Sequence, residues 1–227
     1  MNKIKYLIVF LSFFIIFVNS QSSSLVLIEY YQYREVCSIK DLGYTEPSTL
    51  CHNNTLLSKS IVKQSECIVF QMEPAIFTYD PNNNQIVQKI YSDIVCKDYV
   101  DSKIHIIGSC NSTCMVGDGL IYKMSLVDQV EIPSSTLVSV IYGDKCNKIF
   151  KNSFLEIDYQ YLNNCQVDYE VEPIYSVKTY CNETFITSYI YNGSLCSGQT
   201  TNIEYYPIVN ICSTPDSPLN FMQFCNN

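Results

Sequence analysis

Twelve cysteines are the feature that most limits how this chain of 227 residues can fold. All twelve follow the first 36 residues, and an even number in an exported chain is typical of a disulfide framework. We therefore expect six bridges, in which every cysteine takes part. The bridged residues would be Cys37, Cys51, Cys67, Cys96, Cys110, Cys114, Cys146, Cys165, Cys181, Cys196, Cys212 and Cys225.

A metal site is the other common use of cysteine. Cys110 and Cys114 stand four positions apart, but His52 and His105 are the only histidines that could join them. No second cysteine pair has zinc-finger spacing, and Gly117-Asp118-Gly119 is too short to cradle a phosphate. We expect neither a metal nor any other cofactor.

The amino terminus has the pattern of a secretory signal. Lys3 and Lys5 precede an apolar run over residues 6–18, which ends close to the small side chain of Ser20. The run has 13 residues, whereas a membrane span needs about 20, so we favour a cleaved signal peptide over an uncleaved anchor helix. Residues 1–20 are predicted to be removed, and the mature chain is expected to be secreted, extracellular and without a membrane span.

The mature chain would be strongly acidic. The full sequence holds 14 Lys and Arg against 22 Asp and Glu, a formal charge of −8. Loss of residues 1–20 removes two lysines and no acid, which brings the charge to −10. An acidic surface repels a phosphate backbone, so we do not expect nucleic acid as a partner.

A short pattern of apolar residues, tyrosine, a gap and cysteine recurs four times and predicts an internal repeat. Its cysteines, Cys37, Cys96, Cys146 and Cys196, are 59, 50 and 50 positions apart. The competing explanation is that so many cysteines must show some rough spacing by chance.

A coarser duplication divides the chain in two. A Cys-x-Val sequence that leads to Glu-Pro begins at Cys67 and again at Cys165. The best candidate for a linker between the halves is the Pro/Ser break at residues 131–135. We predict two domains, at residues 21–132 and 133–227.

The local pattern is that of β-strands. Residues 154–162 alternate apolar and polar side chains, and β-branched or aromatic residues dominate in 186–191 and 203–206. Asn192-Gly193 is typical of a tight turn. We therefore expect an all-β fold with two similar antiparallel, sandwich-like domains stapled by disulfides.

Strand length suggests which cysteines pair. A strand of about nine residues between Cys146 and Cys165 would carry the chain roughly 30 Å, far beyond the roughly 7 Å between bridged Cα atoms. Each repeat unit has three cysteines, such as Cys37, Cys51 and Cys67 in the first. The first and third cysteines of a unit should then meet, and second cysteines should pair across units within one half of the chain. The predicted bridges are Cys37–Cys67, Cys146–Cys181, Cys51–Cys110 and Cys165–Cys212, with Cys96–Cys114 as a residual pair.

Four Asn-x-Ser/Thr sequons lack proline at the middle position and are acceptors for N-linked glycan in a secreted chain. Some sequons arise by chance in an asparagine-rich sequence, so one or two can be unused. We expect at least two of them to carry glycan on exposed loops. The sequons begin at Asn53, Asn111, Asn182 and Asn192.

The sequence has no catalytic motif. Neither His52 nor His105 stands in a pattern that joins a nucleophile to its base, and the neighbours of His105 are typical of a strand. Two carboxylate pairs suit glycoside hydrolysis, Asp98 with Asp101 and Glu170 with Glu172. The second pair alternates along the sequence, as acids on the solvated face of a strand would. We assign no catalytic residue.

A family resemblance follows from several features taken together. They are the signal peptide, the chain length, the Asn/Ile/Tyr-rich composition, and the unit of strand, tyrosine, cysteine, strand and cysteine, which is clearest from Tyr189 to Gly198 and on to Cys212. The mature chain resembles the small secreted cysteine-rich proteins of social amoebae of the counting factor-associated A, B and C type. The resemblance implies an extracellular glycoprotein of cell adhesion or group-size control, and it supplies no catalytic residues.

Two classes of function follow. We expect a non-enzymatic protein that binds an extracellular protein or a cell-surface glycan through tyrosine-rich strand faces, because tyrosine gives large amphipathic contacts at low entropic cost. The alternative is a secreted, carboxylate-dependent hydrolase of glycosidase type. The ligand and the oligomeric state stay open at this point.

Overall fold

The computed structural model of the chain describes residues 25–31, 51, 55–70, 73–114, 119–142, 154–168, 173–209 and 220–227. These residues form fifteen β-strands in three antiparallel sheets, which confirms the all-β prediction. No helix among them has the length and apolar character needed to cross a membrane. The predicted signal peptide at residues 1–20 lies outside the described part of the chain.

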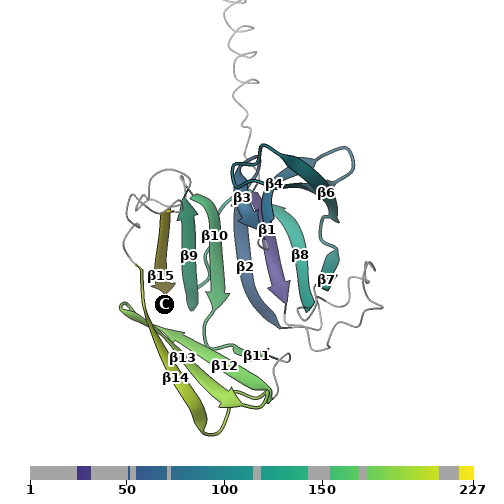
Figure 1. Ribbon diagram of the computed structural model, residues 1–227. Coiled ribbons are helices and arrows are strands. Elements are labelled where there is room, and N and C mark those ends of the chain that lie inside the picture. The colour runs from purple at the N-terminus through teal and green to yellow at the C-terminus, as the bar shows by residue number, and fades with distance from the viewer. Residues whose placement is uncertain are drawn as a thin grey trace, which may run out of the picture.

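Seven strands form a central sheet (Figure 1). They are β1 (Leu25–Tyr31), β2 (Leu56–Lys63), β7 (Cys110–Cys114), β8 (Gly119–Val127), β9 (Thr136–Tyr142), β10 (Phe154–Tyr161) and β15 (Asn220–Asn226). Across the sheet the order is β15-β9-β10-β2-β1-β8-β7. The amino-terminal and carboxy-terminal parts of the chain therefore meet at the β10–β2 pair.

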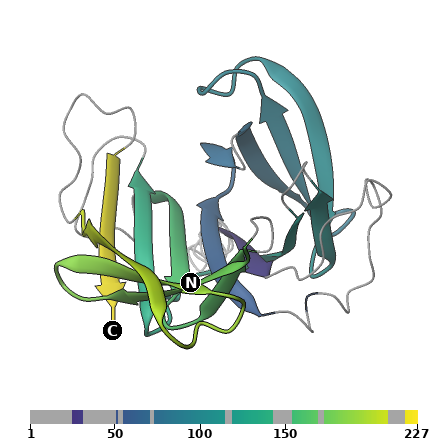
Figure 2. The same cartoon turned by 60° about the horizontal axis from the view of Figure 1, so that its bottom comes forward.

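Two further sheets have four strands each. The first small sheet contains β3 (Cys67–Phe70), β4 (Glu73–Asp80), β5 (Gln85–Tyr91) and β6 (Tyr99–Ile106). The second small sheet contains β11 (Cys165–Asp168), β12 (Tyr175–Cys181), β13 (Phe185–Asn192) and β14 (Thr200–Pro207). In Figures 1 and 2 the first lies beside the β2-β1-β8 part of the central sheet, and the second beside the β15-β9-β10 part.

Both halves of the chain follow the same order of elements. Two central strands, β1 and β2 or β9 and β10, lead into a small sheet, after which the chain returns to the central sheet. The first half returns through β7 and β8, and the described part of the second half returns through β15 alone. Left-handed backbone recurs at matching places, with φ of 63° at both Ser65 and Asn163, and of 52° and 45° at Cys96 and Cys196. The domain boundary between residues 132 and 133 stays a prediction, and strands from both sides of it share the central sheet.

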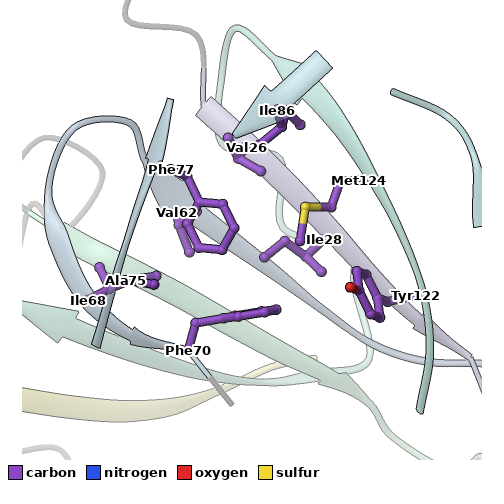
Figure 3. Packing of buried hydrophobic residues seen from close by; sticks show 10 residues of the cluster. All are labelled: Val26, Ile28, Val62, Ile68, Phe70, Ala75, Phe77, Ile86, Tyr122 and Met124. Carbon is purple, nitrogen blue, oxygen red and sulfur yellow. The ribbon is translucent and has the colours of Figure 1, made fainter. Parts of the chain in front are cut away.

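The first core fills the space between the central sheet and the first small sheet (Figure 3). Val26 and Ile28 of β1 point into it and are fully buried. From the small sheet, Phe70 and Phe77 meet edge to face, with ring centroids 5.1 Å apart. Each such fully buried side chain contributes about 1.5–3 kcal/mol to stability. This packing is that of a sandwich.

The second core lies on the opposite face of the central sheet. Ile61 of β2 and Ile157 of β10 stand side by side in the register and are buried there. Val130, just before the Pro/Ser break, and Ile132, within it, pack in this core. Because both faces of the central sheet are covered, its strands do not show the simple alternation of a half-exposed sheet.

Four disulfides join described cysteines, and one of them was predicted correctly. Cys51–Cys110 forms as expected, with Cα atoms 5.9 Å apart. The other three are Cys67–Cys96, Cys165–Cys196 and Cys181–Cys225. All four stay within one half of the chain. Cys37, Cys146 and Cys212 lie outside the described residues.

The remaining pairings from sequence were wrong. Cys67 does not pair with Cys37, nor Cys181 with Cys146, and the expected Cys165–Cys212 and Cys96–Cys114 bridges do not form. The prediction paired the first cysteine of a unit with the third, on the assumption of one strand between successive cysteines of the unit. The Cys67–Cys96 bridge instead spans the interval between two units, where β4 and β5 carry the chain out and back to the same end of the sheet.

Candidate functional site

The outer face of the second small sheet presents a group of aromatic side chains. The register places Tyr180, Thr187 and Tyr205 in one row across β12, β13 and β14. Lys178, Tyr189 and Ile203 form the next row. Residues paired across antiparallel strands share a face, so both rows project to the same side. We call Lys178, Tyr180, Tyr189, Ile203 and Tyr205 the tyrosine face.

The tyrosine face is both ordered and accessible. Tyr180 and Tyr189 meet edge to face, with centroids 5.3 Å apart, and the Lys178 ammonium lies 5.6 Å from the Tyr180 ring centre. Tyr205 is 65% exposed. Exposed apolar groups gathered on one face mark interaction sites more often than scattered single residues do. Rigid rings with polar hydroxyl tips suit contact with another macromolecule.

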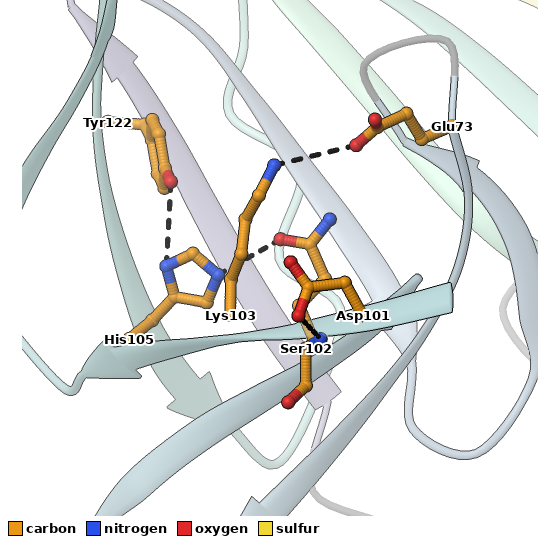
Figure 4. A network of polar contacts seen from close by, with 7 residues as sticks. Glu73, Asp101, Ser102, Lys103, His105 and Tyr122 are labelled. Atoms are coloured by element: carbon orange, nitrogen blue, oxygen red, sulfur yellow. Dashed lines mark hydrogen bonds and ion pairs between the residues drawn. The ribbon is translucent and has the colours of Figure 1, made fainter. Parts of the chain in front are cut away.

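His105 belongs to the core and not to a reactive site (Figure 4). Its side chain is 3% exposed on β6, as the strand prediction implied. Nε2 lies 3.0 Å from the Gln88 amide oxygen, and Nδ1 lies 3.5 Å from the Tyr122 hydroxyl. Burial lowers the pKa of His105 to about 4, with a smaller effect of the Lys103 charge. A neutral imidazole with a polar contact at each ring nitrogen has the properties of a structural core residue.

The carboxylates singled out from sequence do not assemble a site. Asp98 and Asp101 are exposed around the start of β6, and neither lines a described cavity. The Asp98 amide donates to Asp93 and the Ser102 amide to Asp101, which are local turn contacts. His52 and the pair Glu170 and Glu172 lie outside the described residues.

Sequence analysis missed a cavity on the central sheet. It has a volume of about 480 Å³ and lies over the β2–β10 pair, where strands of both small sheets reach it. Two acids of β10, Glu156 and Asp158, lie on its wall with Ser60 of β2. They are two positions apart in a strand and so share a face. That spacing was the available signal, but the alternation in residues 154–162 was used only to predict a strand.

Burial disfavours the ionised forms of both acids. Burial, with a contribution from Asp158, raises the pKa of Glu156 to about 9. Burial also raises the pKa of Asp158, against the opposing effect of its hydrogen bond with Ser60. Tyr30 on β1 hydrogen-bonds to Ser60, and burial raises the pKa of its phenol. Carboxyl groups close together share protons in this way.

Another buried acid, Glu29, lies on the opposite face and is compensated by two lysines. Glu29 is 9% exposed, and its carboxylate oxygens lie 2.7 Å from the ammonium groups of Lys59 and Lys123. Burial pushes the pKa of Glu29 upward, but the hydrogen bonds and charges of the two lysines outweigh it and leave the pKa lowered. Tyr31 also donates to this carboxylate at 3.3 Å. The group is a structural ion triad.

Three of the four sequons fall on described residues. Asn182 is exposed in the turn between β12 and β13, where its side-chain oxygen accepts from the amides of Thr184 and Phe185 at 2.8 Å. Asn192 is exposed at the other end of β13. Asn111 lies in β7, where its amide donates to Ser109 at 3.1 Å. Asn53 lies outside the described part. Glycosylation stays a prediction at all four.

Within the described ranges, no three side chains of the His, Cys, Asp and Glu types gather as a metal site would require. The described chemistry is therefore that of the tyrosine face, the acidic cavity and the disulfides.

Comparison with known proteins gives a consistent result. The family model described as counting factor-associated protein A/B/C matches residues 2–227. Counting factor-associated protein A of Dictyostelium discoideum is 29% identical over 186 residues, which cover 80% of this chain and 79% of that protein. No solved structure matches the chain.

Proposed function

The chain belongs to the counting factor-associated protein A/B/C family, and from this we propose that it is a secreted, non-enzymatic glycoprotein of cell adhesion or group-size control. Its role would be to bind another extracellular protein through the tyrosine face. The printed name of the relative, counting factor-associated protein A, supports a protein partner. The disulfides support an oxidising, extracellular environment, because cytosolic proteins are kept reduced.

The observation that carries this proposal is the exposure of ordered tyrosines on one sheet face. Tyr205 is exposed to solvent. Tyr180 and Tyr189 hold each other in place through an edge-to-face contact, and Lys178 places a positive charge beside the Tyr180 ring. Aromatic anchors of this kind are enriched in protein interfaces, where they bury much area and lose little side-chain entropy. Glycans on Asn182 and Asn192 would add bulk at the two ends of β13.

The hydrolase alternative has one structural feature in its favour, the Glu156 and Asp158 pair in a cavity. A glycosidase needs two carboxyl groups with pKa values pushed apart, one acid and one ionised base or nucleophile. Here the pKa values of both acids are raised, and the two side chains leave the same face of one strand. We therefore favour a binding function over a hydrolase function.

The test uses purified, labelled protein and the cells that secrete it. We expect saturable binding to the cell surface that is lost when the cells are treated with protease. Tyr205→Ser should raise the Kd at least tenfold. Tyr99→Ser is the matched control, because Tyr99 is 58% exposed and also pairs edge to face, with Tyr91 in the first small sheet.

Other outcomes would redirect the proposal. Binding that survives protease but appears on a glycan array would identify a carbohydrate ligand. An unchanged Kd for Tyr205→Ser would remove the tyrosine face as the contact surface. Turnover of any glycoside substrate by the pure protein, lost in Glu156→Gln, would establish the hydrolase instead.

A further inference from the structure

The cavity on the central sheet holds two acidic groups that have no ion pair with any described lysine or arginine. Glu156 is 7% exposed and lines the cavity, and its carboxyl group has no hydrogen bond or ion pair with any described residue. Among the described residues, Asp158 beside it accepts a hydrogen bond only from the Ser60 hydroxyl. A buried carboxyl group left without partners destabilises the fold. Such a group aimed into an open cavity is placed to meet a ligand.

Glu29 is a buried acid with a structural role in the same chain, and it provides a comparison for Glu156. Glu29, on the opposite face of the central sheet, lies between the ammonium groups of Lys59 and Lys123. No described lysine or arginine pairs in this way with Glu156 or Asp158. A cation bound in the cavity would give these two acids the partner that no described lysine or arginine provides.

The volume and the lining residues of the cavity indicate what kind of cation would fit it. About 480 Å³ is room for a small organic molecule, far more than a single metal ion needs. Beside the acids, one part of the lining is apolar, with Leu57, Leu137 and the aromatic residues Tyr30 and Phe70, and another part consists of three serines and two glutamines. Aliphatic and aromatic walls suit an apolar body, and ring faces attract a positive charge. A metal ion would need more oxygen or nitrogen ligands than the described acids offer.

We propose that the cavity binds a small organic ammonium ion with an apolar body, whose ammonium group donates hydrogen bonds to Glu156 and Asp158. This binding would be independent of the tyrosine face, which lies on the outer side of the second small sheet.

Binding of the ammonium ion must release a proton. The free protein carries Glu156 largely protonated near neutral pH, and the ammonium group requires an ionised partner. Tyr30 and Tyr159 are the other titratable residues on the cavity wall, and burial raises the pKa of both phenols, so they stay neutral. The proton therefore leaves the acid pair. Affinity should rise by up to tenfold per pH unit between about pH 6 and 8, where an alkylammonium ion stays charged.

The experiment is calorimetric titration of the full secreted protein with n-pentylammonium chloride. The neutral comparison is 1-pentanol, which has the same body without the charge. We expect n-pentylammonium to bind at least tenfold more tightly than 1-pentanol. Repeating the titration in buffers of different ionisation enthalpy should show release of close to one proton. Calcium chloride and glucose are titrated in parallel as a metal ion and a polyol.

Two variants assign the binding to the acid pair. Glu156→Gln keeps the shape and removes the ionisable group, so the affinity should fall at least tenfold and proton release should disappear. Because Glu156 is already neutral in the free protein, this variant should fold. Asp158→Asn tests the second acid. Glu131→Gln is the matched control, since Glu131 is an exposed acid that lines the cavity on the opposite face.

Several results would overturn the proposal. They are equal affinity for 1-pentanol, unchanged binding by Glu156→Gln, saturation by calcium or glucose but not by the amine, and no heat of binding at ~10 mM amine. None of these results bears on the Tyr205→Ser measurement, so failure here is distinct from failure of the proposed function.

Discussion

Ser60 and Asp158 face each other across the β2–β10 pair, and the Ser60 hydroxyl donates a hydrogen bond to the Asp158 carboxyl group. The two residues are 98 positions apart. Cys67 and Cys165, which begin the two small sheets, have the same separation. The contact therefore joins matching positions of the two halves at the place where the halves meet. It also explains why acids are tolerated there, since each half leaves a polar position at the junction.

Ser60→Ala should destabilise the protein. The change removes the donor to Asp158 in a buried setting, because Ser60 itself is buried. We expect the free energy of unfolding to fall by about 1–3 kcal/mol, which urea denaturation at pH 7 measures. Ser58→Ala, on the same face of β2, is the control and should change it by less than half as much. Equal effects of the two variants would mean that the hydrogen bond adds no specific stability.

The acid pair makes stability depend on pH in an unusual direction. The folded-state pKa of Glu156 is raised to about 9, above its ordinary value of 4.5, so between these values the folded state binds more protons than the unfolded state. Stability should then fall as pH rises through this window, by up to roughly 1.4 kcal/mol per pH unit. Urea denaturation from pH 5 to 9 should show this slope in the wild type and a flatter one in Glu156→Gln. A wild-type slope that the variant leaves unchanged would assign the dependence to other groups.

His105 should behave in the opposite sense. Its folded-state pKa is lowered to about 4 from 6.5, so the stability that depends on the neutral ring is present above pH 6.5 and is lost as pH falls toward 4. Nitrogen NMR of the imidazole should find His105 neutral at pH 5, with the resonance identified by its absence in His105→Gln. Titration near pH 6.5 would contradict the buried position.

The strands could be predicted from sequence because β-branched and aromatic residues fill them. The alternation at residues 154–162 placed β10 correctly, with bounds of Phe154–Tyr161. Their arrangement into sheets was beyond sequence, since pairing of β2 with β10 joins residues about a hundred positions apart. Cysteine pairing failed for a related reason, because the spacing between Cys67 and Cys96 does not show how many strands fit in the interval.

The candidate site shows the same limit. Tyrosines at 189, 191, 205 and 206 could be predicted to lie on strands, but which of them share an exposed face depends on the register. Glu156 and Asp158 have the spacing of a solvated strand face, but residues of both small sheets reach over that face, so Glu156 is buried and Asp158 partly buried. Local patterns therefore gave the strands, while the site depends on contacts distant in sequence.

Processing of the chain is open to direct measurement. We expect the secreted protein to begin near Gln21 and to be heavier than its polypeptide, because at least two of Asn53, Asn111, Asn182 and Asn192 should carry glycan. Mass spectrometry before and after treatment with a glycosidase measures both properties. An intact Met1, or a mass that the glycosidase leaves unchanged, would contradict this prediction.

The two bridges that close the small sheets should contribute nearly equal stability. Cys67–Cys96 spans 29 positions and Cys165–Cys196 spans 31, and each joins the first strand of a small sheet to the loop that follows its third strand. In the chain-entropy description, a loop of this length contributes about 3–4 kcal/mol by restricting the unfolded chain.

We therefore expect the double variants Cys67→Ala/Cys96→Ala and Cys165→Ala/Cys196→Ala to lose similar free energy of unfolding in urea. A single Cys67→Ala variant is the informative contrast, because it leaves Cys96 with a free thiol that can exchange with other bridges. Peptide mapping without reduction should recover both pairs from the wild type. A Cys67 peptide linked to any cysteine other than Cys96, or a double variant that loses no stability, would show that the small sheets are not closed in this way.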